Sequence, residues 1–213
     1  PARTEGRGAD ALGNDENTHS ATYRVPYLAH TTMEPMNATA SVTEEGVTLW
    51  VPTQAPGSVQ KVAAEVAGVD PAKVTVHTTF LGGGFGRRFE TDFVREAVEL
   101  SRRAGRPVKV IYSRPDDVRH DFYRPAAYNE LSATLGDDGL PVTWVHRIAG
   151  PSIWSRVAPG MVKEGIDPAA VEGAADHPYR IENIAVSYAR VEPGIPVGFW
   201  RSVGHSHNAY IVE

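Results

Sequence analysis

The sequence of 213 residues predicts an α+β fold with mixed sheets, on the basis of two patterns. Residues 39–52 and residues 128–149 each contain two alternating apolar–polar segments around a glycine-containing turn, which is typical of an antiparallel hairpin. Between Ser58 and Tyr112, segments with helical spacing of apolar residues alternate with strand-like segments. This helix–strand–helix–strand order indicates a crossover unit in addition to the hairpins.

The first part of the chain is polar and rich in glycine, so we expect residues 1–22 to be a linker-like segment and residues 23–213 to form a folded domain. Residues 23–29 alternate weakly and are predicted to form a short strand before the first hairpin. Ser58 is a suitable N-cap, and the apolar residues after it recur at i, i+3, i+4 and i+7, which predicts a helix. Gly68 would end that helix.

Strand-like and helical segments continue to alternate after this helix. A second helix is predicted with Phe93, Ala97 and Leu100 on one face. The strand-like segments outside the hairpins are residues 74–80, 107–113 and 184–191. The intervening stretch of residues 150–180 has no clear periodicity and is expected to be rich in loops.

The composition excludes several classes of function. A net charge of −5 provides no basic surface for nucleic acid. Because the chain has no cysteine, it cannot form a disulfide, a cysteine-ligated zinc site or an iron–sulfur cluster. Electrons from any redox reaction would therefore leave through a bound cofactor and another domain or subunit. No apolar run reaches the roughly 20 residues of a transmembrane helix, so a soluble protein is expected, and the sequence does not choose between cytoplasm and periplasm.

The glycine-rich segment of residues 81–88 is the most informative motif. Its four glycines surround Phe85 between a predicted strand and a predicted helix, where they permit positive φ angles and close approach of a ligand to the backbone. Exposed N–H groups with Arg87 and Arg88 behind them could hold an anionic group such as phosphate. The segment fits neither the Walker pattern nor the dinucleotide-binding pattern, so a tight structural turn is an equal alternative.

A second candidate site lies in residues 198–208. Arg201 stands between aromatic and small polar residues, where it could pair with an anionic or carbonyl oxygen, although stacking on Trp200 is a structural alternative. His205 and His207 could bind a metal ion. No carboxylate stands at ligand spacing, however, so structural roles are favoured for both histidines.

Two further polar residues carry weaker signals. His30 and Glu34 are four residues apart and could act as acid and base on one helix face. Pro35 disfavours that helix, so a packed and hydrogen-bonded strand end is the preferred interpretation. Gln54 follows a predicted strand and, by its local sequence, is an ordinary surface amide.

Four motifs occur in order along the chain: YLAHTTMEPMN at residues 27–37, WVPTQ at 50–54, GGGFGRR at 82–88 and FWRSVGHSHN at 199–208. Together they resemble the molybdenum hydroxylases of the xanthine dehydrogenase and aldehyde oxidase family, with the isoquinoline 1-oxidoreductase β-subunit branch as the best likeness. The resemblance covers nearly all of the chain from about residue 23. It implies that the α+β fold is part of a molybdopterin-binding domain.

The resemblance also implies roles for particular residues. Gln54 matches the glutamine that hydrogen-bonds an apical ligand of molybdenum. The loop residues whose backbone approaches the metal and cofactor are Gly83, Gly84, Phe85 and Gly86. Arg201 matches an arginine that contacts the site and orients substrate or stabilises developing negative charge, which makes it the expected catalytic residue. No residue is expected to be a direct metal ligand.

The sequence departs from the family pattern at three places. Phe89 stands where the family has a substrate-binding glutamate, and Glu90 is one position late. Ser202 and Val203 replace a glycine and a phenylalanine, which changes the expected shape of the pocket. The family's glutamate base would lie beyond Glu213, so we expect this chain to be a fragment, cut near its C-terminus and inactive alone.

By resemblance, the complete enzyme would hydroxylate an aldehyde or an N-heteroaromatic carbon with water as the oxygen source. The implied cofactor is a molybdenum–pterin group, with the cytosine dinucleotide as one form of its tail. The implied partners are the remainder of the molybdenum subunit, an iron–sulfur (2Fe-2S) electron-transfer subunit and a small-molecule substrate. A non-catalytic scaffold of the same fold is the alternative, and a phosphate-binding module is a third hypothesis.

Overall fold

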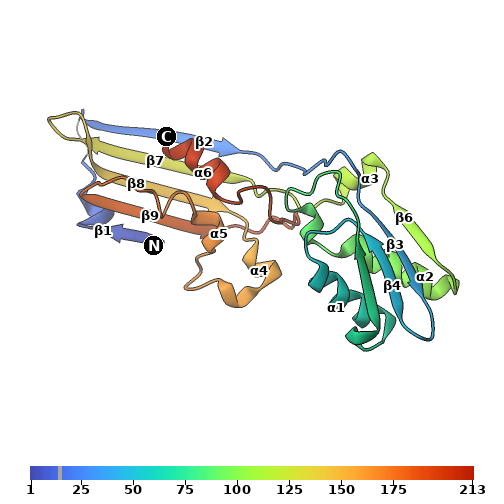
Figure 1. The fold of residues 1–213 in the computed structure, drawn as a ribbon. Coiled ribbons are helices and arrows are strands. Elements are labelled where there is room, and N and C mark those ends of the chain that lie inside the picture. Colours follow the sequence, from blue (N-terminus) through green and yellow to red (C-terminus); the bar gives the residue numbers. More distant parts are fainter. Residues whose placement is uncertain (14–15) are drawn as a thin grey trace. The chain divides into compact units, whose positions relative to one another are not determined.

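The computed structural model describes residues 1–13 and 16–213, and the chain forms two compact units (Figure 1). Unit 1 comprises Pro1–Leu28, Tyr123–Val197 and Arg201–Glu213. Unit 2 comprises Ala29–Phe122 and Gly198–Trp200, so most of it is one stretch inserted into the sequence of unit 1. Each unit contains a sheet with both parallel and antiparallel neighbours, which confirms the predicted α+β class.

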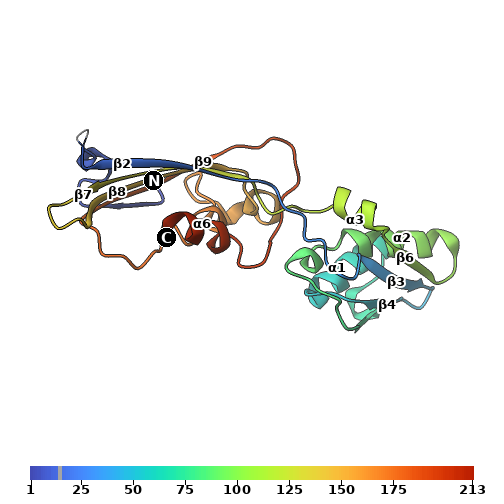
Figure 2. The same ribbon diagram turned by 90° about the horizontal axis from the view of Figure 1, so that it is seen from above.

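Unit 1 is built on a five-stranded sheet in the order β1-β9-β8-β7-β2 (Figures 1 and 2). The strands are β1 (Arg3–Glu5), β2 (Thr18–Val25), β7 (Ala127–Leu135), β8 (Pro141–Gly150) and β9 (Asn183–Arg190). The antiparallel pairing of β7 with β8 confirms the second predicted hairpin. Strands β8 and β9 run parallel, so a long crossover must join them.

Short helices occupy that crossover and the two ends of unit 1. They are η1 (Gly8–Ala11), α4 (Trp154–Val157), η4 (Pro159–Met161), α5 (Pro168–Val171) and α6 (His205–Val212). The core joins the sheet to the crossover through the buried residues Ile148, Val171, Ala174, Ile181, Ile184 and Val186. The crossover has few apolar residues in a regular pattern, which is why its helices are absent from the sequence prediction.

Unit 2 contains a four-stranded sheet in the order β5-β4-β3-β6 (Figures 1 and 2). Its elements are β3 (Asn37–Val42), β4 (Val47–Val51), α1 (Pro56–Ala67), η2 (Pro71–Lys73), β5 (Val74–Thr78), η3 (Arg87–Phe89), α2 (Asp92–Ala104), β6 (Val108–Ile111) and α3 (Arg114–Arg119). Strands β3 and β4 form the first predicted hairpin, and β4 and β5 are parallel across α1, which confirms the crossover unit.

Helices α1 and α2 pack on one face of the unit 2 sheet, because alternate residues of β3 and β4 share one buried core with them. The β3 and β4 residues between those positions point to the opposite face, where Trp50 is 41% exposed. The fold therefore buries one side of the sheet and leaves the strand ends free to carry loops. The glycine-rich segment leaves the sheet at the end of β5.

The structure differs from the predicted elements in four places. The segment predicted as a linker contains β1, paired with β9 at Arg3↔Val186, and its last residues begin β2 at Thr18. Residues 14–15 of that segment lie outside the described residues. Strand β2 ends at Val25 rather than continuing to residue 29. Helix α1 begins at Pro56, before Ser58, because proline favours the first helical turn. Leu100 of α2 is 48% exposed and lies off the buried face.

Candidate functional site

The glycine-rich segment forms a tight loop between β5 and η3. Gly86 has a φ of 105°, and a Cβ at this position would lie 1.7 Å from the carbonyl oxygen of Phe199. A Cβ on Gly84 would lie 2.5 Å from Oε1 of Gln54. Gly86 therefore requires glycine, because its φ is positive and the clash is with backbone, whereas a side chain on residue 84 would displace the Gln54 amide. The absence of side chains lets Gln54 and the Phe199 backbone lie directly against the loop.

The middle of this loop presents unpaired hydrogen-bond donors. Within the described residues, the N–H groups of Gly83, Gly84 and Phe85 have no hydrogen-bond partner. Gly83 and Phe85 have φ values of 98° and 52°, and the Phe85 side chain is 43% exposed. Consecutive free N–H groups in such a loop form a concave surface that suits anionic or oxygen-rich groups. An oxygen-rich cofactor therefore fits this loop.

Gln54 leaves the end of β4 and is fixed against the same loop. Its backbone N–H donates to the carbonyl of Arg88 at 3.0 Å, and its side-chain Oε1 accepts from the N–H of Gly86 at 3.0 Å. With Oε1 engaged in this way, the exposed Nε2 group is the part of the amide that can donate to an external group. Gln54 and the loop thus form a single donor surface.

Arg87 and Arg88 are buried and paired, so neither guanidinium is open to an external anion, and that part of the anion-site hypothesis is wrong. Arg87 makes two hydrogen bonds to Asp92, at 2.8 and 2.6 Å, and an ion pair with Asp121 at 3.1 Å. Arg88 pairs with Glu34 at 2.7 Å and also donates to backbone carbonyls of the loop region. Because their charges are matched by neighbouring carboxylates, the two arginines hold the loop from behind.

His30 and Glu34 do not share a helix face, as the position of Pro35 led us to expect. Oε2 of Glu34 accepts from the N–H of Gly82 at 3.0 Å, which ties the start of the loop to this segment. His30 is buried and pairs with Asp121 at 2.9 Å. The packed, hydrogen-bonded alternative is therefore confirmed for this motif.

Arg201 belongs to unit 1, whereas Gln54 and the glycine loop belong to unit 2. The residue is exposed, and its carbonyl oxygen accepts from the hydroxyls of Ser202 at 2.7 Å and Ser206 at 3.0 Å. Ser202 and Val203 have φ values of 58° and 48°, an unfavourable conformation for a β-branched residue. The turn before α6 is thus strained but tied by its own side chains.

His205 and His207 lie at the start of α6 and differ in environment. His205 is half exposed, with ring nitrogens 3.6 Å from Glu172 and 3.5 Å from Asp176. His207 is buried, and burial lowers its pKa to about 4. Across residues 1–13 and 16–213, no group of three or more His, Asp or Glu side chains is arranged to hold a metal ion. The arrangement favours structural roles for these histidines.

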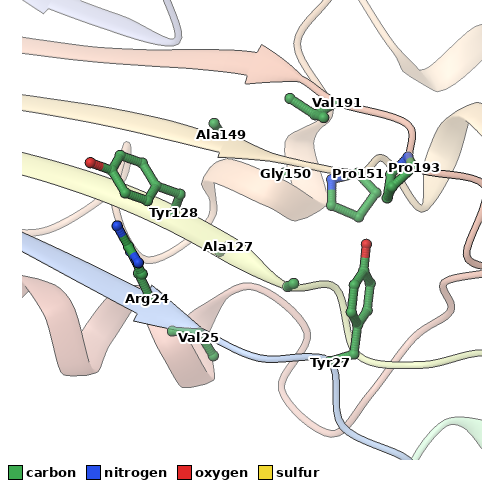
Figure 3. Close-up of a pocket in the computed structure, with 11 residues that line it drawn as sticks. Arg24, Val25, Tyr27, Ala127, Tyr128, Ala149, Gly150, Pro151, Val191 and Pro193 are labelled. Carbon is green, nitrogen blue, oxygen red and sulfur yellow. The ribbon is translucent and has the colours of Figure 1, made fainter.

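Unit 1 also contains an open apolar pocket of about 330 Å³ (Figure 3). The ends of β2, β7 and β8 and the segment after β9 line it, with Tyr27, Pro151 and Pro193 around one end (Figure 3). Burial and the nearby charge of Glu192 raise the pKa of the Tyr27 hydroxyl. Tyr27 begins the motif at residues 27–37, but none of the predicted cofactor-binding or catalytic residues lines this pocket.

A family model described as the molybdopterin cofactor-binding domain matches residues 2–213. The β-subunit of isoquinoline 1-oxidoreductase from Brevundimonas diminuta is 37% identical over 129 residues, which are 60% of this chain and 16% of that protein. Quinoline 2-oxidoreductase from Pseudomonas putida 86 superposes with a TM-score of 0.74 at 21% identity, over 95% of this chain and 26% of that one.

Aldehyde oxidoreductase from Desulfovibrio gigas superposes with the same TM-score of 0.74 at 16% identity, over 94% of this chain and 22% of that one. The chain thus spans about a quarter or less of each of these relatives. In the described residues, no helix is long and apolar enough to cross a bilayer. The resemblance of the four motifs is confirmed, and the chain belongs to the molybdopterin cofactor-binding domain family.

Proposed function

We propose that this chain forms part of the cofactor site of a molybdenum hydroxylase. The observation that carries the proposal is the surface formed by Gln54 and the glycine loop, in which the amide is locked by Gly86 and the N–H groups of residues 83–85 are free. Family membership supports a molybdenum–pterin group as the ligand of that surface. The oxygen atoms of a molybdenum–pterin group accept hydrogen bonds, and this surface offers N–H donors.

Each residue of the proposed site has a separate task. The exposed Nε2 of Gln54 would donate to the metal end of the cofactor, as the family likeness implies. The free N–H groups of Gly83, Gly84 and Phe85 would hold its oxygen atoms. When bound, the molybdenum–pterin group supplies the two-electron oxidation of a carbon centre. Arg201 would stabilise negative charge that develops on the substrate.

The substrate we propose is an aldehyde or an N-heteroaromatic compound, with water as the oxygen source. Relatives named for aldehyde, isoquinoline and quinoline oxidoreduction support this class. The glutamate base would come from the remainder of the molybdenum subunit. The chain has no cysteine to hold a cluster, so the electrons would pass to an iron–sulfur (2Fe-2S) subunit. A cytosine dinucleotide is the proposed tail of the pterin.

Elemental mass spectrometry of the native complex that contains this chain tests the proposal. We expect close to one molybdenum atom per chain, together with an extractable pterin. A complex free of molybdenum, purified from cells that make the cofactor, would contradict it.

A non-catalytic scaffold is the second candidate, and Phe89 favours it. Phe89 stands where the family likeness implies a substrate-binding glutamate. Its ring packs edge-on against that of Phe199, with ring centroids 5.7 Å apart. A scaffold would tolerate Arg201→Ala in the complete complex without loss of turnover. A hydroxylase would lose turnover in the same variant.

A further inference from the structure

A buried ionic cluster lies behind the glycine loop in unit 2. It consists of His30, Asp121 and Arg87, whose side chains are exposed by only 1%, 2% and 1%. Asp121 accepts hydrogen bonds from the backbone N–H of His30 at 2.6 Å and from that of Phe122 at 2.7 Å. It also faces Nδ1 of His30 at 2.9 Å and Nε of Arg87 at 3.1 Å. Burying these charges is costly unless each has a partner, and here each has one.

Contacts at both nitrogens fix the orientation of the His30 ring. Its Nε2 lies 2.9 Å from the carbonyl oxygen of Phe199, which can only accept a hydrogen bond, so this nitrogen must donate. Its Nδ1 faces the Asp121 carboxylate. Burial acts to raise the pKa of Asp121, but hydrogen bonds and the charge of His30 outweigh it and the pKa is lowered. Both ring nitrogens therefore face acceptor oxygens, and the ring is held at both ends.

The cluster holds two separate segments at one point. Asp121 holds Arg87, the residue that follows Gly86, by an ion pair. His30 holds the carbonyl of Phe199 by a hydrogen bond. The two segments touch there, because the Phe199 oxygen occupies the space that a side chain on residue 86 would need. Segment 198–200 joins unit 2 from a distant part of the sequence, and Phe199 also packs edge-on against Phe89 with ring centroids 5.7 Å apart.

We propose that His30 is a positioning residue of the cofactor site. Its ring, anchored by Asp121, fixes the Phe199 carbonyl against Gly86 and so holds the glycine loop from behind. The inference rests on the proposed function, since the loop that His30 holds is part of the proposed cofactor site. A solely structural role would predict that His30 contributes to stability without a specific effect on this segment.

The test uses the complete molybdenum subunit in its native complex and compares three variants. His30→Leu removes both hydrogen bonds of the ring, whereas His30→Gln keeps one side-chain N–H that can reach the Phe199 carbonyl. Ser101→Ala is the matched control in the same unit. Ser101 is fully buried, accepts from Val42 at 3.0 Å and donates to the carbonyl of Arg106 at 2.9 Å. Amide hydrogen exchange by mass spectrometry is the main measurement.

His30→Leu should raise exchange in residues 198–203 by at least roughly tenfold, as expected for a lost buried hydrogen bond. Its kcat should fall by about a hundredfold with KM less affected, because the glycine loop of the proposed cofactor site would be misplaced. His30→Gln should recover part of both effects. Ser101→Ala should lower the melting temperature and leave exchange in residues 198–203 and kcat unchanged.

The inference is overturned if His30→Leu leaves exchange in residues 198–203 as in the wild type, or changes it no more than Ser101→Ala does. If His30→Leu fails to assemble, His30→Phe takes its place, since a phenyl ring keeps most of the volume and has no N–H to donate. Faster exchange confined to residues 198–203 supports the inference, and wild-type exchange overturns it. A wild-type complex without molybdenum would contradict the proposed function. The exchange results would still decide whether His30 holds the segment.

Discussion

At the scale of single residues, the side chain of Gln54 has two ends with different tasks. One end accepts a hydrogen bond from Gly86 and holds the loop, and the other end is free to donate. The two tasks can be separated by substitution. Gln54→Glu would keep the oxygen that accepts from Gly86 and lose the N–H donor, whereas Gln54→Ala would lose both.

We therefore predict that Gln54→Glu leaves the melting temperature of the chain unchanged but lowers cofactor content or kcat of the complex by roughly 10- to 100-fold, the usual effect of losing a partner at a metal site. Gln54→Ala should lower both the activity and the melting temperature. Molybdenum analysis, turnover assays and thermal unfolding measure these effects. Full activity in Gln54→Glu would show that the free amide N–H has no part in the site.

Arg201 gives a second prediction at this scale. Its guanidinium is exposed and its main chain is held by two serine hydroxyls, so the side chain contributes little to folding. Arg201→Ala should reduce kcat of the complex by roughly 100- to 1,000-fold, in line with the loss of one charge-stabilising donor. Arg201→Lys keeps the positive charge but lacks the planar guanidinium, so its kcat should lie between those of the wild type and Arg201→Ala. Equal turnover of all three proteins would favour the scaffold.

At the scale of elements, the glycine loop and the end of α1 offer a controlled comparison. Gly86 and Gly68 both have positive φ, at 105° and 73°. A Cβ on Gly68 would meet nothing within 4 Å, whereas one on Gly86 would collide with the Phe199 backbone. An alanine at residue 68 would cost only the strain of a left-handed backbone. An alanine at residue 86 would cost that strain and a steric clash as well.

Gly68→Ala should lower the free energy of unfolding by about 1 kcal/mol, the cost of a left-handed conformation alone. Gly86→Ala should lower it by more than about 3 kcal/mol, because the backbone of one segment must move. Denaturant titration of each variant gives both values. Similar losses for the two variants would mean that segment 198–200 does not press against the loop.

The elements that sequence could predict are those with local signals. Both hairpins and both long helices follow from periodicity and turn residues, and their pairing is confirmed. Strand β1 has three residues held by backbone hydrogen bonds to β9, and backbone hydrogen bonds leave no pattern of apolar residues.

The environment of the candidate site was harder to predict than its position. Two of the carboxylates that pair with these arginines are distant in sequence: Asp121 comes 34 residues after Arg87, and Glu34 comes 54 residues before Arg88. Asp92 lies close to Arg87 in sequence, but neither it nor the distant pairs leave a periodic pattern that predicts a buried ion pair. The roles of Gln54, the loop and Arg201 toward a cofactor stay predictions until they are measured.

At the scale of the whole molecule, buried histidines of unit 1 make stability depend on pH. Burial lowers the pKa of His146 to about 4, from an ordinary value of 6.5, and does the same for His207. Between these values the unfolded chain binds more protons than the folded one. Stability is therefore complete above pH 6.5 and is lost as the pH falls toward 4.

We predict that the free energy of unfolding falls between pH 7 and pH 4.5 by an amount on the order of 3 kcal/mol for each of these histidines. Nε2 of His146 lies 2.9 Å from Oδ1 of Asn129, so His146→Gln can keep the donor without titrating. Urea titrations at several pH values should give a shallower dependence for this variant. An unchanged dependence would mean that the pKa of His146 is the same in the folded and unfolded chains.

The insertion of unit 2 into unit 1 has a consequence for biosynthesis. Thr18 of β2 pairs beside Thr134 of β7, 116 residues later, and Ala29–Phe122 are made in the interval. At ribosomal rates β2 must wait for its partner for roughly 6 to 20 seconds, while most of unit 2 can collapse first. An apolar strand edge left open for that time would invite aggregation. The sequence of β2, THSATYRV, is mostly polar. It therefore gives little periodic signal, and it keeps the unpaired strand soluble until β7 has been synthesised.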